Sequence, residues 1–307
     1  MELIRRLSGL RPRHLGSVVT IGTFDGIHPG HRALIERLLA HGRRLGRPAM
    51  MLTFEPMPRE YLAAANPPAR LTSWRERWRV LERTGLDQVL QLKFDERLRN
   101  VSGEAFTRLL AEQLRTPVVV IGHDFRFGRN GEASAPMLSD AGRQLGFEVD
   151  VVEPVQVDGE RVSSSAIRAA LACGDLARAE RLLGRPYSMV GRVVLGQQLG
   201  RDLGFPTANL RLGRKRTPLQ GIFAVRVHGI EGRPNAPGVA SLGTRPTVGG
   251  TVPLLEAHVF DFSGDLYGRE IEVEFVSKLR EEVCFATLDE LVVQMNRDAA
   301  EARAILC

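Results

Sequence analysis

The feature that most constrains the fold is a glycine-rich turn at residues 22–31, between an apolar strand and an amphipathic helix. Val18–Ile21 forms an apolar run before the turn, and apolar residues recur at helical spacing over 33–39 after it. A turn of this kind directs free backbone N–H groups and the positive end of a helix dipole toward one point. The sequence therefore predicts an α/β unit with an anion-binding site at this turn.

Two histidines in the turn indicate that the anion is a nucleotide phosphate. His28 and His31 are three residues apart, so their rings should lie on one face of the helix start. Gly30 between them has no side chain that would block a close approach. The alternative is an ordinary strand–helix corner with two solvated histidines. The glycine-rich context directly after a buried strand favours the phosphate site.

Composition narrows the class of ligand. The 307 residues carry a net charge of +6, mostly from arginine, and only 6% of them are aromatic. Because no dense basic run is interleaved with aromatic residues, the charge favours pockets for anionic small molecules over a nucleic-acid surface. The sequence contains no Gly-Lys pair and no Gly-x-Gly, which excludes a P-loop and the dinucleotide fingerprint.

The cysteines and the N-terminus indicate a cytoplasmic protein without a membrane partner. Cys173, Cys284 and Cys307 are widely separated and odd in number, which argues against a disulfide framework or a zinc site. The N-terminus has no apolar leader region, and no stretch approaches the length of a membrane span. We therefore expect a soluble, unprocessed chain in a reducing compartment.

Strand-like and helix-like segments alternate through the first half of the chain. Strands are expected at 18–21, 49–54, 89–92, 118–122 and 149–152, and further helices at 73–81, 103–114 and 136–145. Trp74, Trp78 and Leu81 form the expected apolar stripe of the helix at 73–81. This alternation predicts a parallel sheet covered on both faces. Its ligands should bind beyond the carboxyl ends of the strands, where the strand order switches.

Two further segments of this half carry groups suited to a nucleotide. The loop after the fourth strand holds Asp124, Phe125, Arg126 and Phe127, which suits ring stacking and phosphate pairing. The alternative is a surface loop whose aromatic rings fold onto the core. Serines 163–165 then begin a helix.

The serine segment offers a second place for phosphates. The hydroxyls of Ser164 and Ser165, the free N–H groups of the helix start and Arg168 could hold a triphosphate tail. Plain helix capping is the alternative.

The periodicity of apolar residues changes at Gly184, where an expected short helix over 177–183 ends. Beyond it, strand alternation and turns predict an antiparallel sheet or small barrel closed by one helix. We therefore expect domains at 1–184 and 185–307. The final helix should be capped at Thr287, and its apolar stripe comprises Leu288, Leu291, Val292, Met295 and Ala299.

The second half contains two candidate polar sites. In the glycine-rich loop 196–209, Gly200 and Arg201 are candidates for contacting phosphates, and Thr207 and Asn209 offer neutral oxygens suited to phosphate-held Mg²⁺. A long hairpin loop is the alternative. Over 254–260 the alternation places Glu256 on one face with His258, where a carboxylate could act as a general base. An isolated exposed glutamate is the commoner case.

These motifs, in this order, resemble those of the bacterial bifunctional riboflavin kinase/FAD synthetase family. Residues 22–31 are similar to the Gly-x-Phe-Asp-Gly-x-His-x-Gly-His signature of HxGH nucleotidylyltransferases, and 204–209 to the kinase signature Gly-Phe-Pro-Thr-Ala-Asn. The resemblance covers nearly the whole chain. It implies a Rossmann-type domain that joins FMN to AMP from ATP, giving FAD and pyrophosphate. It also implies a barrel that phosphorylates riboflavin to FMN with ATP and Mg²⁺.

The resemblance also implies roles for individual residues. Catalysis would fall to His28, His31 and Glu256. Nucleotide or phosphate binding would fall to Gly22, Thr23, Phe24, Asp25, Gly30, Ser164, Ser165, Arg168, Gly200, Arg201, Thr207 and Asn209. The flavin would meet Asp124, Phe125, Arg126, Phe127 and Arg280, and Thr207 and Asn209 would also bind the metal. The chain departs from the family pattern at His123, where an acidic residue is usual, and at Ser165, where threonine is usual.

Two other functions stay open at this point. One is a single-activity adenylyl- or cytidylyltransferase whose C-terminal module only binds flavin. The other is a regulatory or nucleic-acid-binding protein on a transferase-like fold, which only the basic net charge supports.

Overall fold

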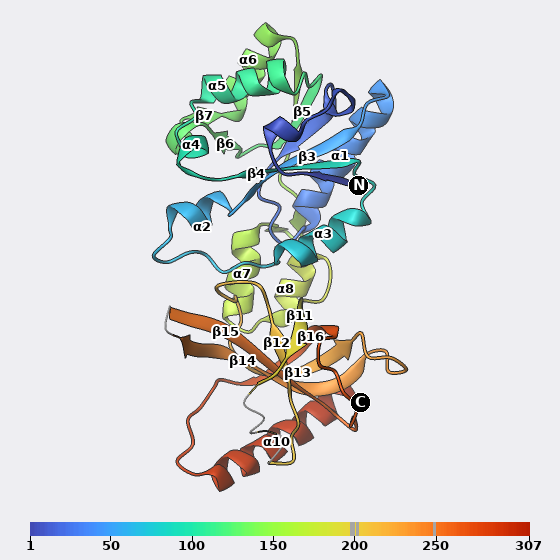
Figure 1. Ribbon diagram of the computed structural model, residues 1–307, viewed down its shortest axis with the longest axis vertical. Coiled ribbons are helices and arrows are strands. Elements are labelled where there is room, and N and C mark those ends of the chain that lie inside the picture. Colours follow the sequence, from blue (N-terminus) through green and yellow to red (C-terminus); the bar gives the residue numbers. More distant parts are fainter. Residues whose placement is uncertain (197–199, 201–202, 248–249) are drawn as a thin grey trace. The chain divides into compact units, whose positions relative to one another are not determined.

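The computed structural model describes residues 1–196, 200, 203–247 and 250–307, and these form two compact units (Figure 1). The sheet unit comprises 1–68 and 77–162, and the barrel unit comprises 69–76 and 163–307. Each unit is described by itself. None of the helices in the described ranges is long and apolar enough to cross a membrane.

The sheet unit is built on six parallel strands in the order β1-β4-β3-β2-β5-β8. They are β1 (Glu2–Ile4), β4 (Gln88–Lys93), β3 (Ala49–Glu55), β2 (Val18–Ile21), β5 (Val118–Gly122) and β8 (Glu148–Val152). The predicted parallel sheet is confirmed. From β2 the chain runs outward to β3 and β4, then returns to place β5 on the other side of β2. The switch in strand order therefore lies between β2 and β5.

Helices cover both faces of this sheet. Val19 and Ile21 pack in the core cluster that contains Phe106 and Leu138, on the side of α5 and α6. Gly42 of α1 approaches Val18 on the opposite face, since side chains alternate along a strand. The helices of this unit and of its border are α1 (Pro29–Leu45), α2 (Pro58–Leu62), α3 (Trp74–Glu82), α4 (Glu96–Arg99), α5 (Gly103–Arg108) and α6 (Ala135–Leu145).

The shorter elements differ most from the expectations. The helix expected at 103–114 is α5 followed by a π-helical turn, Leu109–Gln113. Short 3₁₀ turns lie at Leu7–Gly9, Pro12–His14 and Arg129–Gly131. Two small antiparallel pairs were not expected: β6 (Arg126–Phe127) with β7 (Ala133–Ser134), and β9 (Gln156–Val157) with β10 (Glu160–Arg161).

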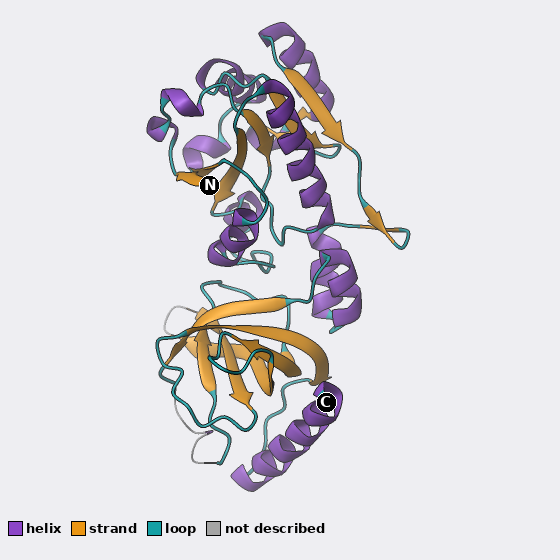
Figure 2. Cartoon of the chain, turned by 90° about the vertical axis from the view of Figure 1, so that its right-hand side faces the viewer, coloured by secondary structure: helices purple, strands orange, loops and turns teal. Residues whose placement is uncertain are grey.

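The barrel unit contains a closed six-stranded antiparallel barrel in the order β11-β12-β15-β14-β13-β16 (Figure 2). Its strands are β11 (Ser188–Val194), β12 (Ala208–Arg211), β15 (Gly250–Val259), β14 (Ala236–Thr247), β13 (Gly221–His228) and β16 (Glu270–Arg280). The predicted small barrel is confirmed, and each of its six strands pairs with two neighbours. Two helices, α7 (Ser164–Ala172) and α8 (Leu176–Leu183), precede it.

The last helix, α10 (Leu288–Leu306), packs against β13, β14 and β16. Thr287 caps it by accepting from the N–H of Glu290 at 3.2 Å, as predicted. The expected apolar stripe is only partly correct, because Leu288 is 56% exposed. The buried side chains lie in the second half, where Ala302 and Leu306 join Ala224 and Phe260 in one apolar cluster.

The stripe predicted for α3 is also only partly correct. Leu81 is fully buried, but Trp74 and Trp78 are half-buried, whereas the charged neighbours Glu76 and Arg77 are buried at 7% and 0% exposure. Helical periodicity does not predict buried charges, because burial of a charge depends on a partner from elsewhere in the chain.

Glu76 finds that partner within the barrel unit. Arg214, whose side chain is 0% exposed, donates to both carboxylate oxygens of Glu76. The same carboxylate accepts from the backbone N–H groups of Val190 and Ser73, each at 2.6 Å. Arg214 also donates to the hydroxyl of Tyr187 at 3.2 Å. The segment 69–76 is thus held to the barrel by a buried and well-connected ion pair.

We expect a Glu76→Gln substitution to lower the free energy of unfolding by about 3–5 kcal/mol, since it leaves the buried Arg214 charge without a carboxylate. Urea unfolding of the full chain measures this. Arg75→Met is the matched control on the same helix, because Arg75 pairs with Glu270 at the surface and should cost less than about 1 kcal/mol. Equal effects of the two substitutions would contradict the interpretation.

Candidate functional site

The turn after β2 lies at the switch point of the sheet, where the sequence predicts an anion site. Helix α1 begins at Pro29, and His28 is its N-cap, whose Nδ1 accepts from the N–H of His31 at 3.4 Å. The two imidazole rings stack with centroids 3.6 Å apart and planes 18° from parallel. The rings therefore lie together, as the spacing predicts. A side chain at Gly30 would lie 3.3 Å from the His28 ring.

The backbone of this turn adopts left-handed conformations at bulky residues. Phe24 has φ 51° and Ile27 has φ 45°, with Gly26 at 92° between them. Phe24 and Ile27 are fully buried, and the Phe24 ring packs against that of His31 at 5.2 Å. Such conformations cost on the order of 1–3 kcal/mol each and persist only where the surroundings enforce them. Burial of these two side chains helps to hold the turn.

The other predicted residues of the turn serve the same packing. Asp25 is 1% exposed, and a side chain at Gly22 would lie 3.1 Å from the Phe24 ring. Thr23 is half-buried. Residues 24–28 are thus all buried, and Gly22 and Thr23 before them are partly exposed.

The loop after β5 lies at the same edge of the sheet. Asp124 pairs with Arg161 at 2.7 Å, and both side chains are exposed. Phe125 and Phe127 stack with centroids 5.5 Å apart, and Phe127 is buried at 8% exposure. Arg126 is exposed. The loop therefore combines the two predicted alternatives, since both aromatic rings pack on the core, Phe125 only partly buried, while the charged groups are exposed.

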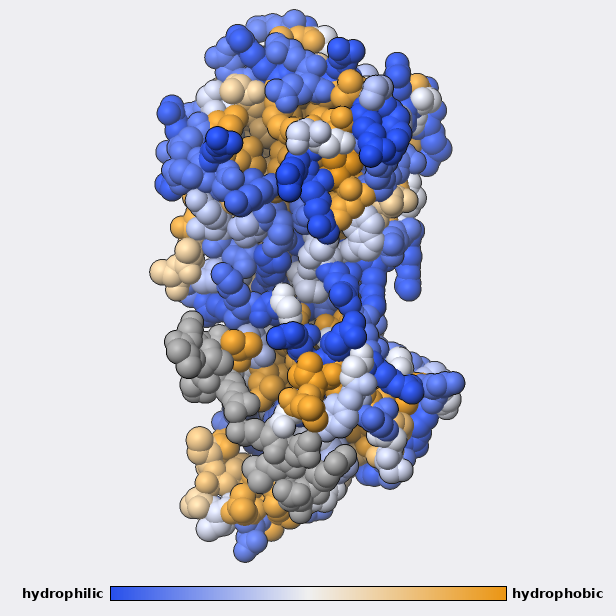
Figure 3. All heavy atoms as spheres, viewed as in Figure 1, coloured by the Kyte–Doolittle hydropathy of each residue, from blue (hydrophilic) through white to orange (hydrophobic). Residues whose placement is uncertain are grey.

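A cavity of about 560 Å³ opens beside this loop. It is lined by aromatic rings and by arginines: Phe54, Phe94, Phe106, Phe125, Phe127, Arg59, Arg99 and Arg126. Apolar side chains gather in the middle of the sheet unit on the face shown in Figure 3, with hydrophilic ones around them. The size and lining of this cavity suit a flat aromatic ligand that carries an anionic group. Phe54 and Phe94 are not among the predicted flavin contacts, although both lie at carboxyl ends of strands.

The serine segment begins α7 in the barrel unit, whereas the paired histidines belong to the sheet unit. Ser163 is the N-cap and accepts from the N–H of Ala166 at 3.1 Å. Ser164 and Ser165 therefore lie in the first turn, and Ser165 is exposed. Nε of Arg168 donates to the carbonyl of Ala69 at 2.6 Å.

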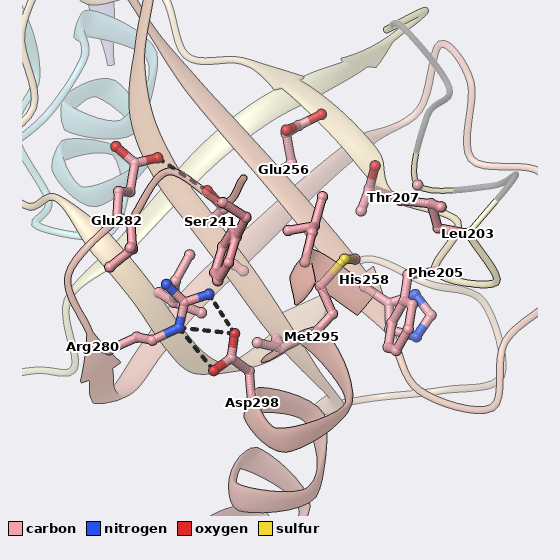
Figure 4. A pocket seen from close by; sticks show the side chains of 17 residues that line it. Leu203, Phe205, Thr207, Ser241, Glu256, His258, Arg280, Glu282, Met295 and Asp298 are labelled. Atoms are coloured by element: carbon pink, nitrogen blue, oxygen red, sulfur yellow. Dashed lines mark hydrogen bonds and ion pairs between the residues drawn. The ribbon is translucent and has the colours of Figure 1, made fainter. Parts of the chain in front are cut away.

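The barrel has a cavity of about 290 Å³ between its strands and α10 (Figure 4). Four predicted residues line it: Gly200, Thr207, Glu256 and Arg280. His258 also lines it, so the predicted common face of Glu256 and His258 is confirmed. Asn209 is buried and lies on β12, directly opposite Glu256 on β15. Arg201 lies outside the described residues.

A buried carboxylate that the sequence analysis missed holds Arg280 in this cavity. Asp298 of α10 is 4% exposed and accepts from Nε of Arg280 at 2.9 Å and from Nη2 at 2.7 Å (Figure 4). Gln294 donates to the same carboxylate at 2.9 Å. The sequence holds one signal for this ion pair. Asp298 is a charged residue between Met295 and Ala299 on the predicted apolar face, and a charge buried on such a face needs a partner of opposite charge.

Thr207 lines a second cavity of the barrel as well. This cavity has a volume of about 470 Å³ and is lined by Phe262, Leu266 and Tyr267 together with small and polar residues. Thr207 is therefore at the border of two cavities, each of which is lined by both carboxylate and aromatic side chains.

The side-chain oxygens of Thr207 and Asn209 near this border suit a cation whose other ligands come from a bound substrate. In the part of the chain that the structure describes, no three His, Cys, Asp or Glu residues form a metal-binding group. Thr207 and Asn209 offer neutral oxygens, and Gly196 leaves room for the Asn209 amide, which lies 2.4 Å from where a Cβ would be. Such a donor set fits Mg²⁺ that is held largely by phosphates.

One unit is an α/β domain of Rossmann type and the other is a small barrel, and each has a cavity with polar lining residues. The FAD synthetase family model matches residues 10–166, and the riboflavin kinase family model matches 183–306. A bifunctional riboflavin kinase/FMN adenylyltransferase from Escherichia coli strain K12 is 46% identical over 305 residues, with 99% of this chain and 97% of the relative covered. The corresponding protein from Pseudomonas fluorescens is 46% identical over 307 residues, with 99% and 98% covered.

A solved structure described as a macrolide-efflux protein from Streptococcus pneumoniae is also similar. It has a TM-score of 0.80 and 30% sequence identity, with 98% of both chains covered. This chain belongs to the bifunctional riboflavin kinase/FMN adenylyltransferase family, so the resemblance noted in the sequence is confirmed.

Proposed function

We propose that this chain carries out both reactions of its family, with riboflavin, FMN and ATP as substrates. Residues 185–307 would phosphorylate riboflavin to FMN, and residues 1–184 would transfer AMP from ATP to FMN, giving FAD and pyrophosphate. The observation that carries the proposal is that each unit has its own cavity lined by predicted site residues. The separate family matches to each half support it and disfavour a barrel that only binds flavin.

In the kinase reaction, the ribityl 5′-hydroxyl of riboflavin attacks the γ-phosphorus of ATP, and ADP leaves. Glu256 takes the hydroxyl proton as the general base. Thr207 borders both cavities, so the flavin can enter one and the nucleotide the other, with the transferred phosphoryl group near Thr207. Arg280, which Asp298 holds in place, would contact the flavin. Gly200 and Arg201 would contact the phosphates of ATP.

Mg²⁺ is proposed for the kinase site, with Thr207 and Asn209 among its ligands. The cation would neutralise charge on the ATP phosphates during transfer.

Removal of the divalent cation should therefore abolish FMN formation. With EDTA in excess over Mg²⁺, we expect the rate to fall at least about a hundredfold and to return when Mg²⁺ is added again. The kinase rate is followed by chromatography of riboflavin and FMN. A rate that EDTA leaves unchanged would contradict the metal assignment.

In the adenylyl transfer, an oxygen of the FMN phosphate attacks the α-phosphorus of ATP in line, and the bond to pyrophosphate breaks. His28, His31 and the backbone N–H groups of the turn stabilise the charge that develops on the α-phosphate oxygens. Ser164, Ser165 and Arg168 would hold the departing pyrophosphate.

The nucleotide and the flavin would each have further contacts in this half of the chain. The nucleotide would also contact Gly22, Thr23, Phe24, Asp25 and Gly30. The stacked Phe125 and Phe127 in the cavity at the end of β5 support binding of the isoalloxazine ring there, with Asp124 and Arg126 at its polar edge.

One experiment tests the whole proposal. The purified chain is incubated with riboflavin, ATP and Mg²⁺, and the flavins are separated by chromatography. FMN followed by FAD supports both activities. FAD formed only from added FMN would support the single-activity alternative. Salt-sensitive RNA binding without flavin turnover would favour the nucleic-acid alternative.

The cytoplasm is the proposed compartment. The cysteines at 173, 284 and 307 are free and exposed, which is typical of proteins in a reducing environment.

A further inference from the structure

Arg77 is the largest fully buried side chain of the described residues, with 0% exposure. It lies on α3, where the sequence predicts an apolar stripe of tryptophans and leucine instead. A guanidinium removed from water is strongly unfavourable unless hydrogen bonds and opposite charges compensate it. Its partners therefore indicate why it is retained in the core.

Those partners lie at the two strand ends beside the proposed adenylyl-transfer site. Nη1 of Arg77 donates to the backbone carbonyl of Thr23 at 2.6 Å. Nη2 lies 3.5 Å from Oε2 of Glu55, the last residue of β3. Arg77 thus links the turn after β2 to the end of the neighbouring strand.

The contact with Thr23 fixes the direction of a peptide group in the turn. In a trans peptide the C=O and the following N–H point in opposite directions. The Thr23–Phe24 bond is not among the cis peptide bonds of the described residues. Because Arg77 holds the Thr23 carbonyl, the Phe24 N–H must point away from Arg77.

The turn needs such a support. Phe24, directly after the fixed peptide, has φ 51°, which is unfavourable for a bulky side chain. A buried arginine that donates to the Thr23 carbonyl and also pairs with the Glu55 carboxylate can hold this conformation, whereas the ammonium group of a lysine is a single point charge on a flexible stem. The exposed side of the turn can then present its amides in a fixed orientation.

We propose that Arg77 is a positioning residue for adenylyl transfer. It does not touch substrate, but it orients the backbone amides of the 22–31 turn toward the phosphate of ATP. This inference rests on the proposed function of the turn. It predicts a loss in kcat rather than in flavin affinity, because misdirected amides would stabilise the transition state less while the flavin cavity is unchanged.

The test compares Arg77→Met, Arg77→Lys and the unmodified full chain. We expect Arg77→Met to lower kcat of FAD formation from FMN and ATP about 10- to 100-fold, with KM for FMN changed less than about threefold. Arg77→Lys should recover part of the loss. Arg83→Met, an exposed arginine just after α3, is the matched control and should leave kcat unchanged.

The kinase reaction of the same samples reports on the fold of the barrel unit, and the KM for FMN reports on that of the sheet unit, which contains Arg77. FMN formation within about twofold of the unmodified chain, together with the kcat loss, supports the inference. Unchanged FAD formation in Arg77→Met overturns it, as does a parallel loss of both activities in Arg77→Lys. If Arg77→Met does not fold, Arg77→Lys decides alone, because it keeps a buried cation. An unmodified chain that forms no FAD would instead refute the proposed function of the turn.

Discussion

A His28→Ala variant is expected to form FAD from FMN and ATP about a hundred- to a thousandfold more slowly than the unmodified chain. Loss of one preorganised donor to a developing phosphate charge typically costs about 3–4 kcal/mol in activation free energy. The stacked arrangement with His31 places both rings at the beginning of α1. The rate is measured by chromatography with FMN and ATP as the starting substrates.

Two comparisons separate this effect from a loss of structure. His28 is also the N-cap of α1, and loss of a cap costs about 1 kcal/mol of stability, so the KM for FMN of the same sample is recorded as a measure of the fold of the sheet unit. His41→Ala on the same helix is the matched control, because His41 contacts Asp150 rather than the turn. FAD formation at the unmodified rate in His28→Ala would refute the assignment of the turn.

A Glu256→Gln variant should lose FMN formation by a factor of about 10²–10⁴. The amide keeps the shape of the side chain but cannot accept the proton of the ribityl hydroxyl, and general-base catalysis contributes a factor of this size. Glu256 lines the barrel cavity and lies opposite Asn209. The measurement is FMN formed from riboflavin and ATP with saturating Mg²⁺.

The same barrel offers a matched control. Glu274 on β16 pairs with His228 at 3.0 Å and does not line the cavity, so Glu274→Gln should leave FMN formation close to the unmodified rate. FAD formation from added FMN should be unaffected in both variants. Undiminished FMN formation in Glu256→Gln would show that another group takes the proton.

The local patterns of the sequence predict much of this fold because their causes are local. Apolar runs such as Val18–Ile21 and Val118–Gly122 are buried strands in the sheet. Thr287 caps the last helix as its spacing to Glu290 predicts. The stacking of His28 on His31 follows from a three-residue spacing at a helix start.

Features that depend on distant partners could not be predicted in the same way. The short strands β1 and β12 exist because β4 and β15 pair with them, and neither carries a strong pattern of its own. The burial of Arg77 depends on Thr23, 54 residues earlier, and that of Asp298 on Arg280. For Arg77 and Asp298, a charged residue on an expected apolar face is the only local sign in the sequence.

The grouping of residues 69–76 with the barrel has a consequence for dissecting this enzyme. A fragment starting at Pro186 would omit Glu76 and deprive Arg214 of its carboxylate. A kinase fragment that begins after residue 184 therefore lacks the segment 69–76, which belongs to the barrel unit in the intact chain. We expect such a piece to need a synthetic peptide of that sequence, or a graft of it, before it regains the stability it has in the intact polypeptide.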